Sequence, residues 1–266
     1  MPTTPPRDGI SINYEIHGDG PPLILVSGTG HDLHFWDGQV PRFSGSFRTI
    51  VFDNRGVGAS SVPEPGFSLA DMADDAAHVL DTEGIEQAHV MGFSMGGHIS
   101  QELALNHPGR VLSLGIHHSW TRNGARLRKF QETRLYLAQQ DQRVALAEIS
   151  MLALHASTYY DQHVEEMDAH RAFLLEKSPV NAGWIGQLKA CIVGDTYDRL
   201  PEIKVPTLVT CSDLDLIASP HLSAEIHAQI PGSEIRILEG TGHVALMEDP
   251  DRFSEVCLEF LQRVTA

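Results

Sequence analysis

The sequence predicts an α/β fold in which a mostly parallel, twisted sheet carries helices on both faces. Two observations support this prediction. Short runs typical of strands recur along the 266 residues, and segments with helical periodicity separate most of them. Some of the runs, such as residues 23–26, are continuously apolar, as expected for strands that are covered on both faces. Strands that alternate with helices favour a parallel sheet.

The expected elements follow one another along the chain. The first strand is the alternating run 10–16, which ends at the turn-forming residues 18–22. Further strands are expected at 23–26, 47–52, 88–91, 111–116, 206–210 and 235–238. Helices are expected at 69–82, 95–106, 223–229 and 253–261.

The alternation is interrupted once, from about residue 121 to residue 193. This stretch has helical periodicity without a convincing strand, so its simplest interpretation is a helical insertion between two strands of the sheet. We therefore expect two domains. Residues 1–120 and 194–266 would form the core, and residues 121–193 would form a helical cap, or lid.

Charge and composition limit the classes of partner. The 35 acidic and 19 basic side chains give a formal charge of −16, which should repel nucleic acids and anionic membranes. No apolar run approaches the roughly 20 residues that cross a membrane, and the amino terminus does not resemble a secretory signal. Three widely spaced cysteines are too few for a disulfide framework. We expect a cytoplasmic protein, and a homo-oligomer is compatible with the sequence.

Ser94 lies in the glycine-rich stretch 92–97, between an expected strand and an expected helix. A serine at such a corner is presented above the carboxyl edge of the sheet, on a strained backbone. Gly92 and Gly96 allow the strand and the helix to approach closely, and the first N–H groups of the helix favour developing negative charge. A chance match is the alternative in a chain with 23 glycines. The placement between strand and helix favours a nucleophile.

A serine nucleophile needs a base, and the base needs a third group that orients it. His243 is the candidate base because it lies in a glycine-containing loop directly after the last expected strand. Asp215 is the preferred acid at the end of the expected strand 206–210, and Asp213 at the same strand end is the alternative.

With Ser94, Asp215 and His243 in this order, the sequence resembles the α/β-hydrolase superfamily over nearly its whole length outside residues 121–193. The resemblance lies in residues 52–60, 92–97, 205–208 and 242–250, and residues 30–40 are similar to the corresponding stretch of 3-oxoadipate enol-lactone hydrolases. It implies an α/β-hydrolase fold with a helical lid, and an oxyanion hole formed by the N–H groups of Thr29 and Met95. The chain departs from the common pattern at Ser27-Gly28, where many members have His-Gly, and in one extra residue between Asp215 and Pro220.

The resemblance implies a cofactor-independent serine hydrolase of the carboxylesterase or lactonase type, with no metal. The substrate would be a small, partly apolar ester or (enol-)lactone, cleaved through an acyl-enzyme. Two alternatives remain on the same fold: cleavage of a carbon–carbon bond in a ring-cleavage diketone or cofactor-free oxygenation, and a ligand sensor that turns over slowly or not at all.

Several side chains are candidates for a pocket above Ser94. The aromatic ones are Trp120, Phe130, Tyr159 and Trp184, and packing within the lid is the alternative for each. The basic ones, Arg122, Arg126, Arg128 and Lys129, could bind a substrate carboxylate, but a solvated helix face is the preferred interpretation. His31 and His34 lack a further metal ligand, which favours a structural role over a metal site.

Overall fold

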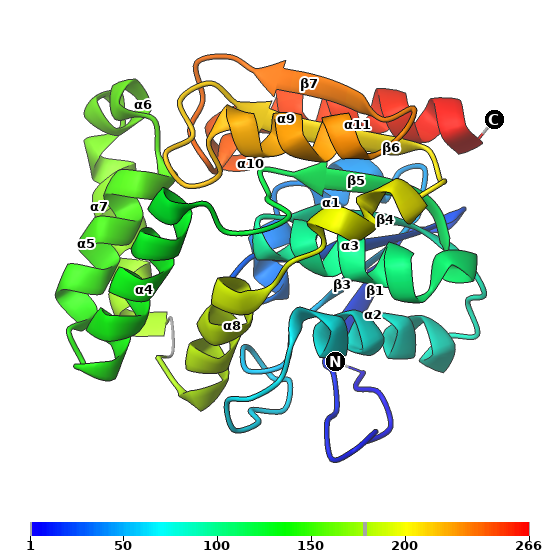
Figure 1. Cartoon of the computed structure of the whole chain (residues 1–266), viewed down its shortest axis with the longest axis horizontal. Helices are drawn as coiled ribbons and strands as arrows, with labels where there is room; N and C mark the ends of the chain where they lie inside the picture. Colours follow the sequence, from blue (N-terminus) through cyan, green and yellow to red (C-terminus); the bar gives the residue numbers. More distant parts are fainter. Residues whose placement is uncertain (1, 178–179, 266) are drawn as a thin grey trace.

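The computed structural model describes residues 2–177 and 180–265, and a seven-stranded sheet crosses its centre (Figure 1). The strand order is β1-β3-β2-β4-β5-β6-β7, with β1 antiparallel to β3 and all other neighbours parallel. The strands are β1 (Tyr14–His17), β2 (Pro22–Val26), β3 (Arg48–Phe52), β4 (Ala88–Phe93), β5 (Val111–His117), β6 (Thr207–Ser212) and β7 (Glu234–Leu238). The predicted fold class is confirmed.

The central strands are buried on both faces because helices cover the sheet on either side (Figure 1). Residues 23–26 of β2 are fully buried, and every residue of β4 is buried. The α-helices outside residues 121–193 are α1 (Val40–Phe43), α2 (Leu69–Thr82), α3 (Met95–Asn106), α9 (Pro220–Gln229), α10 (Ala245–Glu248) and α11 (Pro250–Thr265), and the short 3-10 helices are η1 (Leu33–Trp36), η2 (Pro108–Arg110) and η3 (Tyr197–Glu202). This double cover explains the continuous apolar runs in the sequence.

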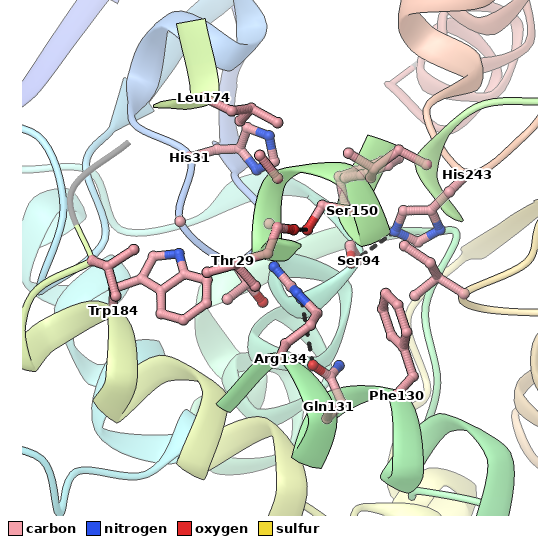
Figure 2. A pocket seen from close by; sticks show the side chains of 18 of the residues that line it. Thr29, His31, Ser94, Phe130, Gln131, Arg134, Ser150, Leu174, Trp184 and His243 are labelled. Carbon is pink, nitrogen blue, oxygen red and sulfur yellow. Dashed lines mark hydrogen bonds between the residues drawn. The ribbon is translucent and has the colours of Figure 1, made fainter. Parts of the chain in front are cut away.

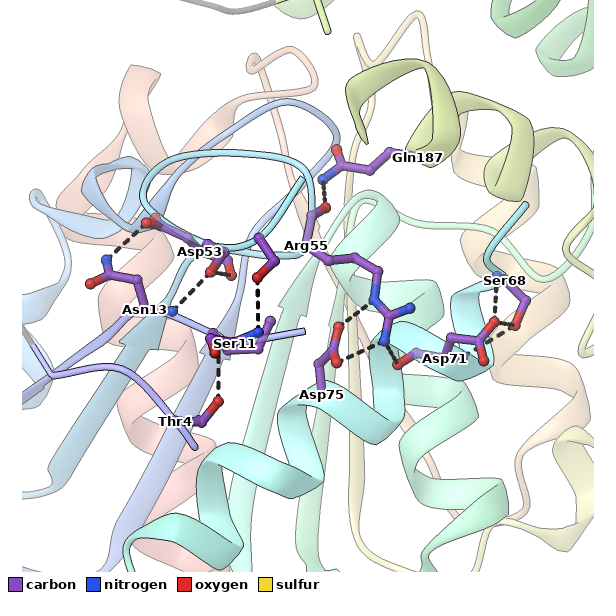
Figure 3. A network of polar contacts seen from close by, with 12 residues as sticks. Thr4, Ser11, Asn13, Asp53, Arg55, Ser68, Asp71, Asp75 and Gln187 are labelled. Carbon is purple, nitrogen blue, oxygen red and sulfur yellow. Dashed lines mark hydrogen bonds and ion pairs between the residues drawn. The ribbon is translucent and has the colours of Figure 1, made fainter. Parts of the chain in front are cut away.

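The first strand is shorter than the alternating run 10–16 predicts, because residues 10–13 pair with loops rather than with the sheet. Asn13 donates from its side chain to the Asp53 carboxylate at 2.8 Å, and its backbone N–H donates to Ser60 Oγ at 2.8 Å (Figure 3). The other oxygen of Asp53 accepts the N–H of Leu33 at 2.7 Å. This buried carboxylate therefore joins the amino-terminal segment to the loops that follow β2 and β3.

Local sequence signals set the helix ends. α2 begins with a capping box, in which Ser68 Oγ accepts the N–H of Asp71 at 3.1 Å and the Asp71 carboxylate accepts the N–H of Ser68 at 2.7 Å (Figure 3). α9 begins at Pro220, three residues before the expected start, because proline is favoured in the first turn of a helix.

In the described part of the chain, five α-helices and then η3 lie between β5 and β6, and the α-helices lie together beyond one end of the sheet (Figure 1). They are α4 (Ala125–Gln139), α5 (Arg143–Leu154), α6 (Ser157–Gln162), α7 (Val164–Lys177) and α8 (Ala182–Val193). Ala138, Leu146, Trp184 and Leu188 form a small apolar cluster of their own among these helices, separate from the main core. A helix with the length and apolar character to span a bilayer is absent from residues 2–177 and 180–265.

Candidate active site

Ser94 lies at the corner between β4 and α3, on a backbone with φ 56° and ψ −118°. This conformation is unfavourable for a residue with a side chain, so the surroundings must hold it in place. The N–H of Ser94 donates to the carbonyl of His117 at 2.8 Å, and Ser119 Oγ donates to the carbonyl of Ser94 at 2.7 Å. Both partners lie in or just after β5, so the neighbouring strand fixes the corner.

The glycines around Ser94 allow α3 to pack directly on the sheet. A Cβ atom on Gly92 would overlap the carbonyl of Gly96, and a Cβ atom on Gly96 would overlap the carbonyl of Val26 in β2. A Cβ atom on Gly97 would lie 2.6 Å from the Cβ atom of Ser119. The stretch 92–97 is therefore rich in glycine because backbone passes against backbone at this point.

Three side chains from separate loops form a hydrogen-bonded series at the carboxyl edge of the sheet. His243 Nε2 lies 3.0 Å from Ser94 Oγ, and His243 Nδ1 lies 2.8 Å from Asp215 Oδ2. The other oxygen, Asp215 Oδ1, accepts the N–H groups of Ile217 at 2.7 Å and Ala218 at 2.9 Å. The side chains of His243 and Asp215 are almost completely buried. This is the geometry in which a histidine can remove a proton from a serine hydroxyl.

The structure distinguishes the two candidate acids. Asp213 Oδ1 accepts the N–H of Gly240 at 2.7 Å on the exposed side of the loop, and Asp215 contacts the imidazole. Burial raises the pKa of the Asp215 carboxyl, but the His243 imidazole and the hydrogen bond to it outweigh burial and lower the pKa below its usual value. Asp215 is therefore ionised at neutral pH, as a group that stabilises an imidazolium must be.

The carboxylate of Glu248 binds the backbone of the loop that carries His243. One oxygen of this buried carboxylate accepts the N–H of Gly242 at 2.8 Å, and the other accepts the N–H of Ala156 at 2.9 Å. In addition, the N–H of Val244 donates to the carbonyl of Leu154 at 3.2 Å. We call this set of contacts the Glu248 junction. It ties the histidine loop to the chain between α5 and α6.

The expected oxyanion donors lie on two elements that meet beside Ser94. Thr29 lies in a turn in which the N–H of His31 donates to the carbonyl of Gly28 at 3.3 Å, and Met95 is the first residue of α3. Across residues 2–177 and 180–265, the backbone N–H groups of Thr29 and Met95 donate to no backbone or side-chain acceptor. Two N–H groups that are free in this way suit an oxyanion.

Gln187 of α8 positions the turn that contains Thr29. Its Oε1 accepts the N–H of Gly30 at 2.9 Å, and its Nε2 donates to the carbonyl of Arg55 at 2.9 Å (Figure 3). Arg55 is fixed in turn by a two-pronged ion pair with Asp75, at 2.6 and 2.8 Å. A helix from the 121–193 segment therefore supports the turn beside Ser94.

A pocket opens above Ser94 between the core and the helices α4, α5, α7 and α8 (Figure 2). Most of its lining is apolar or aromatic, which is typical of sites for small organic ligands. The lining residues are Gly28, Thr29, Gly30, His31, Phe93, Ser94, Phe130, Gln131, Arg134, Arg143, Leu146, Ala147, Ser150, Leu154, Leu174, Val180, Trp184, Ile217 and His243.

Two of the four expected aromatic lining residues, Phe130 and Trp184, line the pocket (Figure 2). The other two need correction. Trp120 is completely buried in the main core, with its ring 6.1 Å from that of His98. Tyr159 stacks on His163 at 4.0 Å between ring centroids and bonds to Glu166 at 3.1 Å, away from the pocket. Aromatic side chains serve packing as readily as binding, and these two pack.

The basic cluster at the start of the insertion also lies outside the pocket. Arg122 stacks on the ring of Tyr197 at 3.6 Å, and Lys129 pairs with Glu132 at 2.8 Å on the exposed face of α4. Arg126 and Arg128 are exposed. The pocket instead contains Arg134, one to two turns further along α4, which no sequence pattern distinguishes from the other basic residues of this helix.

His31 and His34 lie in different environments. His31 lines the pocket, and burial lowers the pKa of its imidazole to about 3, so the ring is neutral. His34 is exposed and lies 3.3 Å from the carboxylate of Asp37. Within the described ranges, the His, Cys, Asp and Glu side chains form no group of three or more that could hold a metal ion.

Comparisons with known proteins agree with this architecture. Residues 21–250 match the family model described as alpha/beta hydrolase fold. The chain is 31% identical over 249 residues to the "Putative carbamate hydrolase RutD" of Azorhizobium caulinodans, with 94% of each protein covered. It is 29% identical to the protein of the same name from Caulobacter segnis, over 98% of this chain and 99% of the relative.

Solved structures are similar over almost the whole chain. An enol-lactonase from Burkholderia xenovorans LB400 superposes with a TM-score of 0.89 at 26% identity, covering 96% of this chain and 98% of that one. A thermophilic esterase from Thermogutta terrifontis with malate bound gives a TM-score of 0.89 at 26% identity, covering 99% and 98%.

Proposed function

Because the chain belongs to the alpha/beta hydrolase fold family, we propose that it is a cofactor-independent serine hydrolase that cleaves a small, partly apolar ester or lactone. The observation that carries this proposal is the series Ser94–His243–Asp215, with 3.0 and 2.8 Å between successive side chains, of which Ser94 and His243 line the pocket. A serine hydroxyl that is hydrogen-bonded to an oriented imidazole and lies beside two unused N–H groups is equipped for acyl transfer.

In the proposed mechanism, Ser94 Oγ attacks the substrate carbonyl while His243 Nε2 accepts the hydroxyl proton. Asp215 holds the proton of His243 on Nδ1 and stabilises the imidazolium that forms. The N–H groups of Thr29 and Met95 bind the oxyanion, and each such donor typically contributes about 3 kcal/mol to lowering the barrier. His243 then gives its proton to the leaving oxygen, and water releases the acyl group by the same steps in reverse.

The helices of residues 121–193 would act as the cap of this site. Phe130 of α4 and Trp184 of α8 face the pocket, so the cap would supply most of the apolar surface that selects the substrate. Gln187 links the same segment to the turn of Thr29. A cap in this position would exclude water from the acyl-enzyme until the leaving group has departed.

A carbamate is the second candidate substrate, because the relatives from Azorhizobium caulinodans and Caulobacter segnis carry the name "Putative carbamate hydrolase RutD". The carbonyl of a carbamate accepts the same attack by Ser94, and the difference lies in the leaving group. Rates measured for an ester, a lactone and a carbamate of equal size would rank these substrates. A vinylogous diketone in the same series would test cleavage of a carbon–carbon bond.

The decisive experiment compares the wild type with Ser94→Ala and His243→Ala. We expect burst kinetics with p-nitrophenyl acetate and labelling of Ser94 by a fluorophosphonate in the wild type, and loss of nearly all activity in both variants. Thermal unfolding of Ser94→Ala should stay close to that of the wild type, because the change removes only the Oγ atom. His243→Ala should unfold at a lower temperature, because it removes a buried ring beside Phe93 and leaves Asp215 without its partner. A retained rate in either variant would contradict the assignment, and a wild type that shows neither burst nor labelling would favour a ligand sensor.

A further inference from the structure

The pocket has the opposite charge to the rest of the protein. The chain as a whole carries a formal charge of −16. Among the described residues, the pocket lining contains Arg134, whose Nε is buried, and exposed Arg143, whose Nη2 donates to the carbonyl of Leu175, and no aspartate or glutamate. Asp215, the carboxylate of the catalytic series, contacts the far side of the His243 ring and does not line the pocket. The interior of the site therefore favours an anion although the surface of the protein repels one.

Arg134 has no acidic partner within the described part of the chain. Its Nη1 reaches only the amide oxygen of Gln131, at 3.4 Å, and its Nε is buried without any hydrogen bond. The guanidinium points from α4 into the pocket between two rings, with its carbon atom 5.7 Å from the centre of Phe130 and 5.5 Å from that of Trp184 (Figure 2).

Such an environment is costly for a cation. Burial lowers the pKa of Arg134 to about 10, yet the group stays protonated at neutral pH. A buried charge is normally paired, and the ring faces of Phe130 and Trp184 replace only part of the lost hydration. Planar guanidinium groups bind carboxylates through two parallel hydrogen bonds. Arg134 thus presents unused donors to whatever occupies the pocket.

We propose that Arg134 binds a carboxylate of the substrate, so that the pocket selects esters or lactones that carry a second, ionised acid group. This inference rests on the proposed function, since the carboxylate would be held while Ser94 attacks the other carbonyl. Arg134 would then act as a specificity residue. It would pair with the anionic end of the substrate, and Phe130 and Trp184 would contact the apolar chain in between.

The experiment uses matched pairs of activated esters. p-Nitrophenyl monoesters of glutarate, adipate and pimelate are compared with the same compounds as methyl esters, which have nearly the same length and no charge. We expect kcat/KM of the wild type to be at least about tenfold higher for the charged member of the best pair, since a hydrogen bond to a charged group is worth about 1.5–3 kcal/mol. Arg134→Met should reduce this ratio to about one, mainly through KM, and Arg134→Lys should keep part of it.

Arg128→Met is the matched control, because it removes a positive charge from the exposed face of the same helix. It should keep both the rates and the charge ratio of the wild type. Arg134→Met should unfold at the same temperature as the wild type or higher, because it removes an unpaired buried charge. A wild type without preference for the charged esters, or a preference that survives Arg134→Met, would overturn the proposal.

A binding measurement separates this proposal from the proposed function. Ser94→Ala can hold monomethyl adipate without turnover, and calorimetry would measure its affinity with and without the additional change Arg134→Met. We expect the affinity to fall at least about tenfold in the double variant. If the double variant loses affinity while the wild type hydrolyses none of the esters, the result would support the role of Arg134 and refute the hydrolase assignment. Equal affinities would refute the role of Arg134 whatever the turnover.

Discussion

Replacing Asp215 by asparagine tests the catalytic series most sharply, because the structure limits how the new amide can be oriented. Asp215 Oδ1 accepts two backbone N–H groups, and Oδ2 accepts the proton of His243 Nδ1. An asparagine has one carbonyl oxygen for these two positions. With its NH2 group toward the backbone it would leave two buried N–H groups without an acceptor, at about 1–3 kcal/mol each.

The amide should therefore keep its oxygen on the backbone and turn its NH2 group toward His243. Nδ1 must then accept a hydrogen bond, so the proton of the imidazole moves to Nε2. An imidazole that is protonated on the side of Ser94 cannot take the hydroxyl proton. We expect kcat/KM to fall by about 10⁴-fold, or roughly 5 kcal/mol in the activation barrier, as in other triads with this change.

The assay is ester hydrolysis of the wild type, Asp215→Asn and Asp213→Asn, with thermal unfolding as the check on folding. Asp213→Asn is the matched control, because asparagine can still accept the N–H of Gly240 through its carbonyl oxygen. It should change the rate by no more than about twofold. The reasoning is refuted if Asp215→Asn keeps more than about 1% of the wild-type rate, or if Asp213→Asn is the more damaging change.

Three further predictions concern packing, acid stability and the pocket. Gly96→Ala should unfold the protein at markedly lower temperature, because its Cβ atom would overlap the carbonyl of Val26, whereas Gly109→Ala, with open space around it, should be tolerated in the same calorimetric scan. Despite burial, His243 lowers the pKa of Asp215, so the folded protein holds this proton less tightly than the unfolded chain. The resulting stability is present above the unfolded pKa of about 4 and is lost as the pH falls through the lower folded pKa. Urea titrations below about pH 4 should therefore show a steeper loss of unfolding free energy in the wild type than in Asp215→Asn. Phe130→Ala should raise KM for esters with long acyl chains, and Tyr159→Phe should leave kcat/KM unchanged; an equal effect of both would contradict the assignment of the pocket lining.

The fold could be predicted from the sequence because its signals are local. The apolar run 23–26 indicates a strand that is buried on both faces, and the glycines around Ser94 indicate a close strand-to-helix corner. The alternation of such strands and helices along the chain indicates a parallel sheet. The position of His243 after the last strand follows from the same reasoning. The choice between Asp213 and Asp215 stayed open in the sequence, because it depends on how one loop turns against another.

The residues of the pocket were harder to predict because side-chain direction depends on tertiary packing. Trp120 in the loop after β5 and Phe130 in α4 were both candidates for the pocket, yet one packs in the core and the other faces the cavity. Arg134 is not predictable as a pocket residue, because a charged residue on a helix usually faces solvent. It lies instead beside Trp184, because α8 packs against α4. The pairing of helices distant in sequence is invisible in the pattern of either one.

The Glu248 junction has a consequence for the exchange of segments between family members. A chimera that replaces residues 121–193 would also replace Leu154 and Ala156, whose backbone groups hold the loop of His243. Gly242 passes so close to residues 154–156 that a side chain would not fit there. A new cap segment would therefore displace the loop of His243, unless its backbone follows the same path beside Gly242. The same few peptide groups, at residues 154–156 and 242, therefore limit both how the cap can change and how the catalytic histidine is held.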